Sequence, residues 1–441
     1  MGEKITSYHG WGKYPRATHT AVLRPAWMDE VTPLALAQNA PLLAFGLGRS
    51  YGDSCLNDGG ALMDMRQLDR VLTFDTERGL VVCEAGVSLG EILLLAVPRG
   101  WFLPVTPGTK LVTLGGAISN DVHGKNHHQQ GTLGCHIEQL ELVRSTGEIM
   151  LCSRTENPGL FAATIGGMGL TGIIRRASLK LKKISSAQVA VETVPFDTFH
   201  DFERLSSDDE GGRWEYTVGW IDCLSGQKTR GLFMRGNHAK EGPLNTHPEK
   251  TRLNVPFNLP DFTLNRLTIW LFNTLYYAAG RRGARAKTSH YDPFFYPLDK
   301  LNNWNRIYGH RGLTQYQCVV PESEAGAFQE ILKRIAKSRQ GSFLGVIKKF
   351  GHAKSPGMMS FPRPGLTLAL DFPFRNELTL RLFEDLDNVV LAARGALYPA
   401  KDPRMSPAMF RASYPSMDEF RRWVDPALSS SFWRRVSEET K

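Results

Sequence analysis

The sequence has few cysteines, and none of them are closely paired. Its 441 residues include six cysteines, which lie far apart and form no CxxC motif. Structural zinc sites and disulfide-rich folds both need closely spaced cysteines, so the sequence predicts neither. Scattered cysteines are typical of a reducing compartment, and we therefore expect the protein to be cytoplasmic.

Long apolar runs are also missing. No stretch approaches the run of about 18 apolar residues that a membrane span needs, and the N-terminus MGEKITSYHGWGKYPR has no apolar signal core. The segment 261–287 is nevertheless apolar almost all round, with Asp261 as its expected N-cap and a basic end after Gly280. It has two interpretations, a buried core helix or a helix that contacts lipid through its apolar body and basic end.

Positive charge is present but not concentrated. The net charge of +9 is spread along the chain, apart from RRGARAK at 281–287 and a weaker cluster near the C-terminus. This pattern permits an anionic ligand or membrane surface but is too diffuse to indicate a nucleic acid partner. Beyond SNDVHGKNHHQQG (119–131), no cluster of His, Cys or Asp has the spacing of metal ligands, so we expect no metal site.

The coarse pattern of the chain predicts an α+β fold. Residues 40–185 contain many glycines, short β-like runs such as LVVCEAG, and two short helical candidates, SLGEILLLAVPRG and NPGLFAATIGG. After residue 187 glycine becomes rarer and bulky residues alternate, as in RWEYTVGWID and TQYQCVVP. Because the chain exceeds the usual size of a single core, we place a domain boundary there.

Two glycine-rich stretches suggest a nucleotide cofactor without a Rossmann fold. Gly167, Gly169 and Gly172 satisfy G-x-G-x-x-G, but the β-like run IIRRASLKLKK follows, where that motif requires a helix. The loops at 41–54 and 106–124 could instead bind phosphate through backbone N–H groups. Each glycine on its own could equally serve a tight turn.

These loops resemble the FAD-binding domain of the vanillyl-alcohol-oxidase/p-cresol-methylhydroxylase superfamily. Within it, GLGRSYGDS, AISNDVHGKNHH, SFLGVIKKFG and LYPAKDPR are similar to the decaprenylphosphoryl-β-D-ribose 2′-oxidase family, and the likeness covers nearly the whole chain. The resemblance implies a two-domain fold. Residues 1–186 and a C-terminal return segment, 396–441, would form the FAD-binding domain, and residues 187–395 an inserted substrate-binding domain with an antiparallel sheet.

The resemblance also implies a reaction and partners. That family oxidises the 2-hydroxyl of a polyprenyl-phosphate-linked ribose to a 2-keto sugar, the first half of an epimerisation to arabinose for cell-surface glycan precursors. We therefore expect a short-chain dehydrogenase/reductase to act on the product, and peripheral contact with the inner membrane, with the periplasmic face left open. The alternatives are an FAD-dependent oxidase of a soluble sugar, polyol or aldonolactone, and a catalytically silent protein that binds a lipid carrier.

Site residues follow from the same resemblance. Lys401 and His123 are the candidate catalytic residues, and the sequence does not decide which is the base. Many superfamily members link a histidine of the first glycine loop to the flavin, but Arg49 stands there, so we expect non-covalent FAD. The implied cofactor-binding residues are Gly46, Gly48, Arg49, Ser50, Tyr51, Gly52, Gly108, Thr113, Gly115, Gly116, Asn120, Asp121, His123, Ile174 and Tyr398. The implied substrate-binding residues are Lys125, Trp220, Arg306, Gln315, Gln317, Lys348 and Asp371.

Overall fold

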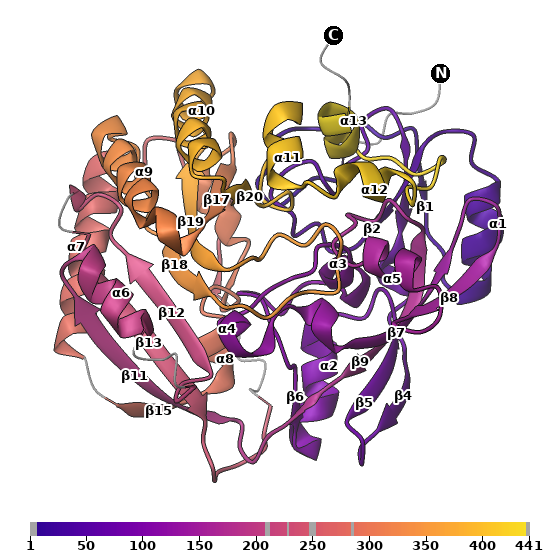
Figure 1. Cartoon of the computed structure of the whole chain (residues 1–441), viewed down its shortest axis with the longest axis horizontal. Coiled ribbons are helices and arrows are strands. Elements are labelled where there is room, and N and C mark those ends of the chain that lie inside the picture. The colour runs from indigo at the N-terminus through magenta and orange to yellow at the C-terminus, as the bar shows by residue number, and fades with distance from the viewer. Residues whose placement is uncertain (1–6, 208–211, 227–228, 247–252, 284–285, 438–441) are drawn as a thin grey trace.

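The protein folds into two lobes that lie side by side (Figure 1). The computed structural model describes residues 7–207, 212–226, 229–246, 253–283 and 286–437. Helices and mainly antiparallel sheets are both present, which confirms the predicted α+β class.

The first lobe contains two sheets from the N-terminal part of the chain. Three parallel strands have the order β1-β3-β2, and five antiparallel strands have the order β4-β5-β9-β7-β8. The strands are β1 (Ala21–Leu23), β2 (Leu42–Phe45), β3 (Ala61–Asp64), β4 (Val71–Asp75), β5 (Leu80–Glu84), β7 (Ile137–Val143), β8 (Ile149–Ser153) and β9 (Ile173–Lys180). The helices are α1 (Val31–Leu36), α2 (Leu89–Ala96), α3 (Leu114–Ser119), α4 (His127–Gln130) and α5 (Pro158–Thr164). Because β9 follows Gly172 directly, the decision against a Rossmann motif is confirmed.

The second lobe is built on one antiparallel sheet of eight strands. Its order is β15-β11-β13-β12-β18-β19-β17-β20. The strands are β11 (Gln188–Phe196), β12 (Tyr216–Ile221), β13 (Gly231–His238), β15 (Lys287–His290), β17 (Leu313–Val320), β18 (Gly345–Phe350), β19 (Gly365–Pro373) and β20 (Ala396–Leu397). The helices of this lobe are α6 (Phe199–Ser207), α7 (Arg266–Arg282), α8 (Tyr291–Phe295), α9 (Ala325–Ser338) and α10 (Glu377–Ala392). Two short pairs, β6 (Trp101–Phe102) with β10 (Lys182–Lys183) and β14 (Leu253–Asn254) with β16 (Leu301–Asn302), complete the strands.

The C-terminal helices α11 (Pro407–Ser413), α12 (Met417–Arg421) and α13 (Ser431–Ser437) return to the first lobe. Leu42 N–H donates to the carbonyl of Ala427 over 2.8 Å, and Arg435 pairs with Asp53 at 2.6 Å. These contacts bring the segment before α11, which carries Lys401, beside the first glycine loop. The exact domain limits at 186 and 396 stay a prediction, since β20 still belongs to the large sheet.

Helix α7 differs from its predicted form in its start, its end and its burial. Its N-cap is Asn265, whose side chain accepts hydrogen bonds from two backbone N–H groups, whereas Asp261 lies outside and pairs with Arg311 at 3.1 Å. The helix continues through Gly280 to Arg282. The core-helix interpretation is wrong for most of the helix, because its exposed apolar side chains are Leu267, Trp270, Leu271, Phe272, Leu275 and Tyr276. We call these six residues the α7 patch.

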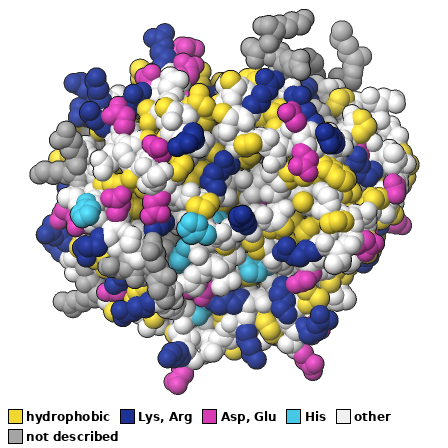
Figure 2. All heavy atoms as spheres, in the orientation of Figure 1, with side chains coloured by type: hydrophobic (Ala, Val, Ile, Leu, Met, Phe, Trp, Pro, Cys, Tyr) yellow, Lys and Arg dark blue, Asp and Glu magenta, His cyan; other side chains and the backbone are white. Residues whose placement is uncertain are grey.

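The surface charge, the helix lengths and the cysteines bear on possible partners, membrane spans and metal sites. Basic and acidic side chains are interspersed over the face drawn in Figure 2. In the part of the chain that the structure describes, no helix is long and apolar enough to cross a bilayer, and no three His, Cys, Asp or Glu side chains gather as a metal site. All six cysteines are free thiols.

Candidate active site

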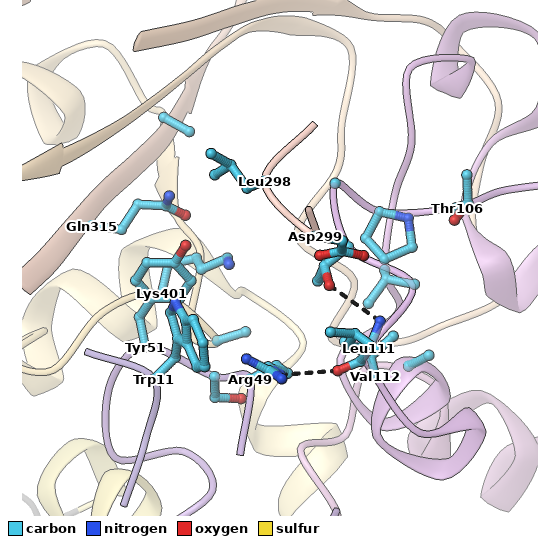
Figure 3. A pocket seen from close by; sticks show the side chains of 18 of the residues that line it. Trp11, Arg49, Tyr51, Thr106, Leu111, Val112, Leu298, Asp299, Gln315 and Lys401 are labelled. Carbon is cyan, nitrogen blue, oxygen red and sulfur yellow. Dashed lines mark hydrogen bonds between the residues drawn. The ribbon is translucent and has the colours of Figure 1, made fainter. Parts of the chain in front are cut away.

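A cavity of about 1000 Å³ lies between the two lobes (Figure 3). Its walls include both glycine loops of the first lobe and one face of the eight-stranded sheet. The cavity brings together most of the residues that the sequence singles out. They are Gly46, Gly48, Arg49, Ser50, Tyr51, Gly108, Thr113, Gly115, Gly116, Asn120, His123, Lys125, Ile174, Trp220, Gln315, Gln317, Lys348, Asp371, Tyr398 and Lys401.

Three predicted site residues do not line the cavity. The Asp121 carboxylate is buried and accepts hydrogen bonds from one backbone N–H and two serine hydroxyls. Gly52 packs so closely on the chain that an added Cβ would lie 2.4 Å from the carbonyl oxygen of Asp402. Arg306 donates to two backbone carbonyls in 255–256. These residues support the loops around the cavity instead of facing a ligand.

The two glycine loops present bare backbone to the cavity. Gly48 has a φ of +61°, a left-handed conformation that favours glycine, and a Cβ added at Gly108 would meet nothing within 4 Å. The Nε–H of Arg49 donates to the carbonyl of Leu111 over 3.1 Å and joins the loops (Figure 3). Two joined loops with glycine backbone at the cavity wall suit a phosphate-rich cofactor, so the residues present fit FAD.

Residues that no motif revealed complete the wall near the first loop. The guanidinium of Arg49 lies 4.0 Å from the centre of the Trp11 ring, and Nζ of Lys401 lies 3.8 Å from the centre of the Tyr51 ring. Figure 3 shows Trp11, Tyr51 and Lys401 grouped on one side of the cavity. Trp11 lies outside the glycine motifs, so the sequence did not predict that it lines the cavity.

Three half-buried lysines give the cavity positive charge. Burial lowers the pKa of Lys125 to about 8 and that of Lys348 to about 7, and the charges of Lys125 and Lys401 lower the pKa of Lys348 further. Burial also lowers the pKa of Lys401, while the charge of Asp371 opposes this change. Because the charges of Lys125 and Lys401 disfavour the charged form of Lys348, an anion in this cavity would stabilise that charge.

His123 is held between two of the other candidates. Its Nδ1 lies 3.2 Å from Nζ of Lys348, and its Nε2 lies 3.1 Å from the amide nitrogen of Gln317. Burial first, and the charge of Lys348 second, hold the pKa of His123 well below its ordinary value. The amide nitrogen of Gln317 can only donate, so it occupies the one lone pair of the neutral imidazole. The ring N–H at Nδ1 then faces Lys348, which can accept it only as a neutral amine.

The eight-stranded sheet aligns the polar side chains of the opposite wall. Gln315 on β17 lies directly opposite Asp371 on β19 and donates to its carboxylate through the side-chain amide. Gln315 and Gln317 are two residues apart and both reach the cavity, as expected for one face of a strand. Burial raises the pKa of Asp371, against the hydrogen bond from Gln315 and the charge of Lys401.

Comparison with known proteins agrees with this site. Residues 21–153 match the FAD binding domain family. The chain is 37% identical, over 97% of its length and 96% of the relative, to the decaprenylphosphoryl-β-D-ribose oxidase of Mycolicibacterium smegmatis. The chain belongs to the decaprenylphosphoryl-β-D-ribose oxidase family.

Other relatives are similar over shorter or less informative ranges. An uncharacterised protein of Streptomyces coelicolor is 31% identical over 79% of this chain and its own full length. Bovine L-gulonolactone oxidase is 29% identical, but over only 41% of each chain. Membership of the decaprenylphosphoryl-β-D-ribose oxidase family confirms the family resemblance, the FAD cofactor and the assignment as an FAD-dependent oxidoreductase.

Proposed function

We propose that this member of the family oxidises the 2-hydroxyl of a ribose linked to a polyprenyl phosphate and releases a 2-keto sugar. One observation carries the proposal: Lys125, Lys348 and Lys401 line a single cavity, where the charges of Lys125 and Lys401 lower the pKa of Lys348. A neutral polyol or lactone offers nothing to offset that positive charge, whereas a phosphodiester does. The similarity to bovine L-gulonolactone oxidase also covers only 41% of this chain, against 97% for the decaprenylphosphoryl-β-D-ribose oxidase of Mycolicibacterium smegmatis, which favours the phosphorylated substrate.

In the proposed reaction FAD accepts the hydride, and the glycine loops of the protein hold FAD. Bound FAD supplies the acceptor for the hydride that leaves the sugar carbon. The residues at 46–51 and 108–116 would hold it through backbone N–H groups. The guanidinium of Arg49 stays charged, and its charge is delocalised over all three nitrogens, so none of them is a nucleophile. These residues would therefore hold FAD without a covalent bond.

We assign the substrate contacts of the cavity residues from their charge and position. We assign the substrate's phosphate to Lys125, whose Nζ otherwise contacts only the carbonyl of Phe295, at 3.3 Å, among the described hydrogen bonds. Gln315 and Gln317 face the cavity from one strand and would bind sugar hydroxyls. Asp371 orients Gln315, and Trp220 forms part of the apolar wall.

We assign the proton of the reacting hydroxyl to Lys401. Burial lowers its pKa to about 8, which leaves a fraction of the neutral amine near neutral pH. After accepting the proton, the ammonium would place a positive charge beside the reacting carbon. His123 has no free lone pair while Lys348 and Gln317 occupy both ring nitrogens. We therefore make His123 a positioning residue.

The proposed substrate and product also imply contact with a membrane and with a second enzyme. We propose peripheral contact with the inner membrane through the α7 patch, on the cytoplasmic side, because a polyprenyl chain keeps the substrate in a bilayer. The keto product must then be reduced to the epimeric alcohol, which requires a hydride donor. A separate short-chain dehydrogenase/reductase would provide that second half-reaction.

Anaerobic bleaching of the protein's yellow colour tests the proposal. The protein is mixed without oxygen with a polyprenyl-phosphoribose, a polyol or an aldonolactone. The phosphoribose should bleach the flavin within seconds, and the two soluble substrates should leave it oxidised. Bleaching by the polyol or the lactone alone would replace the proposed substrate by a soluble one.

A further inference from the structure

The cavity and the α7 patch share two side chains. Phe272 and Tyr276 line the cavity and also belong to the α7 patch, with exposed fractions of 45% and 40%. Lys125 and Lys348 belong to the same cavity. The cavity therefore has a cationic interior and an aromatic opening beside α7.

Aromatic rings form a frame around this opening. The ring of Phe272 lies 5.3 Å from that of Phe343 and stacks on that of Tyr276 at 5.8 Å, and the ring of Tyr276 lies 4.7 Å from that of Trp220. The indole N–H of Trp220 donates to the carbonyl of Phe343 over 3.0 Å. Its one polar hydrogen is thus bonded within the frame, and an apolar surface remains for a ligand.

The apolar surface continues outside the opening. Fifteen large apolar side chains are exposed among the described residues, and nine of them lie between Leu253 and Tyr276. Exposed apolar surface that is gathered in one region marks an interaction site. The sequence from 253 to 290 contains one acidic residue, Asp261, and five basic ones, at 266, 281, 282, 285 and 287. This charge balance complements an anionic lipid surface.

From this continuity we infer that the isoprenoid chain of the substrate leaves the cavity along the rings of Phe272 and Tyr276 and passes directly into the bilayer. The inference rests on the proposed function, because it takes the substrate to be a lipid phosphate. The phosphosugar head stays with the lysines, and the chain crosses the aromatic frame without entering water. Helix α7 then selects for long-chain substrates as well as contacting the membrane.

A matched pair of variants separates the route of the chain from surface docking. Phe272→Gln changes a residue that lines the cavity. Leu271→Gln changes its neighbour, which is 49% exposed but does not line the cavity. Both remove one exposed apolar side chain from α7, so they should weaken vesicle binding equally. Turnover is measured with a long-chain phosphoribose in phosphatidylcholine/phosphatidylglycerol vesicles and with a soluble analogue of one isoprene unit.

The two variants should differ only with the long chain. Phe272→Gln should lower kcat/KM about tenfold for the long-chain substrate and less than twofold for the short one, as expected for the loss of one or two methylene contacts. Leu271→Gln at saturating vesicles should match the wild type with both. Equal losses for long and short chains, or equal behaviour of the two variants, would overturn the inference.

Photo-crosslinking tests the route without turnover. A polyprenyl phosphate with a diazirine on an isoprene unit near the phosphate should label peptides that contain Phe272, Tyr276 or Phe343. Labelling confined to other parts of the cavity, with none on these three residues, would overturn it. If labelling maps to α7 while no ribose substrate bleaches the flavin, the proposed reaction fails and the lipid route stands.

Discussion

The Nδ1 atom of His123 lies 3.2 Å from Nζ of Lys348, so a basic residue of the sequence motif is bonded to a second basic residue from another lobe. Lys348 lies 225 residues further along the chain, on β18. With Gln317 at the other ring nitrogen, His123 acts as a fixed polar link across the cavity.

Replacing His123 should therefore cost less than replacing a base. His123→Gln keeps one hydrogen-bonding group, and we expect the rate of flavin reduction to fall by about tenfold, or about 1.4 kcal/mol of activation free energy. Loss of a general base typically costs 10²-fold or more. Stopped-flow reduction of flavin-loaded variants measures this difference. A loss as large as that of a Lys401 variant would make His123 the base.

Lys125 should make substrate binding depend on pH. Burial lowers its pKa to about 8 from an ordinary 10.5, and only its ammonium form attracts phosphate. Above pH 8 the free enzyme loses the proton, so KM should rise by up to about tenfold per pH unit.

The same linkage predicts that binding takes up protons. The bound phosphate favours the ammonium and raises the pKa of Lys125, so near pH 8 the complex should hold more protons than the free protein. Calorimetry in buffers of different ionisation enthalpy measures the uptake. Lys125→Met should raise KM more than it lowers kcat and remove both effects. An unchanged pH profile in Lys125→Met would exclude this lysine as the phosphate ligand.

The presence of Arg49 in the first glycine loop predicts that FAD is bound without a covalent link. Its side chain donates to Leu111 and packs on Trp11, and it cannot form the bond that a histidine forms in many relatives. Acid precipitation should therefore release the yellow colour into the supernatant. Colour that stays with the denatured pellet would show a covalent link through another residue. Arg49→Ala should weaken FAD retention, because it unties the two glycine loops.

Local sequence signals predicted the strands and loops well. The alternation in IIRRASLK identified β9, and with it the absence of a Rossmann helix after Gly172. The start of α7 was misplaced because Asp261 and Asn265 are both good N-caps. Thr268, three residues after Asn265, completes a reciprocal cap, which was the signal that could have decided between them.

Contacts between distant segments were not predictable in the same way. An apolar helix is buried or exposed according to what packs on it, so composition alone left α7 undecided. Trp11 and Phe272 carry no motif, and they reach the cavity only because the N-terminal segment and the second lobe close over the glycine loops. Lys401 lies 350 residues after Tyr51 in the sequence. A hydrogen bond from the backbone N–H of Tyr51 to the carbonyl of Ala400 brings the two residues together.

The most direct test of the account compares Lys401→Arg with Lys401→Ala in proteins that retain FAD. Arginine keeps the positive charge but cannot become a neutral base, because its pKa exceeds 12. If Lys401 accepts the hydroxyl proton, both variants should reduce their flavin on the order of 10²-fold or more below the wild-type rate. Added methylamine should partly restore Lys401→Ala. Stopped-flow reduction at saturating polyprenyl-phosphoribose is the measurement, and a Lys401→Arg protein that reduces its flavin at the wild-type rate would contradict the assignment of Lys401 as the base.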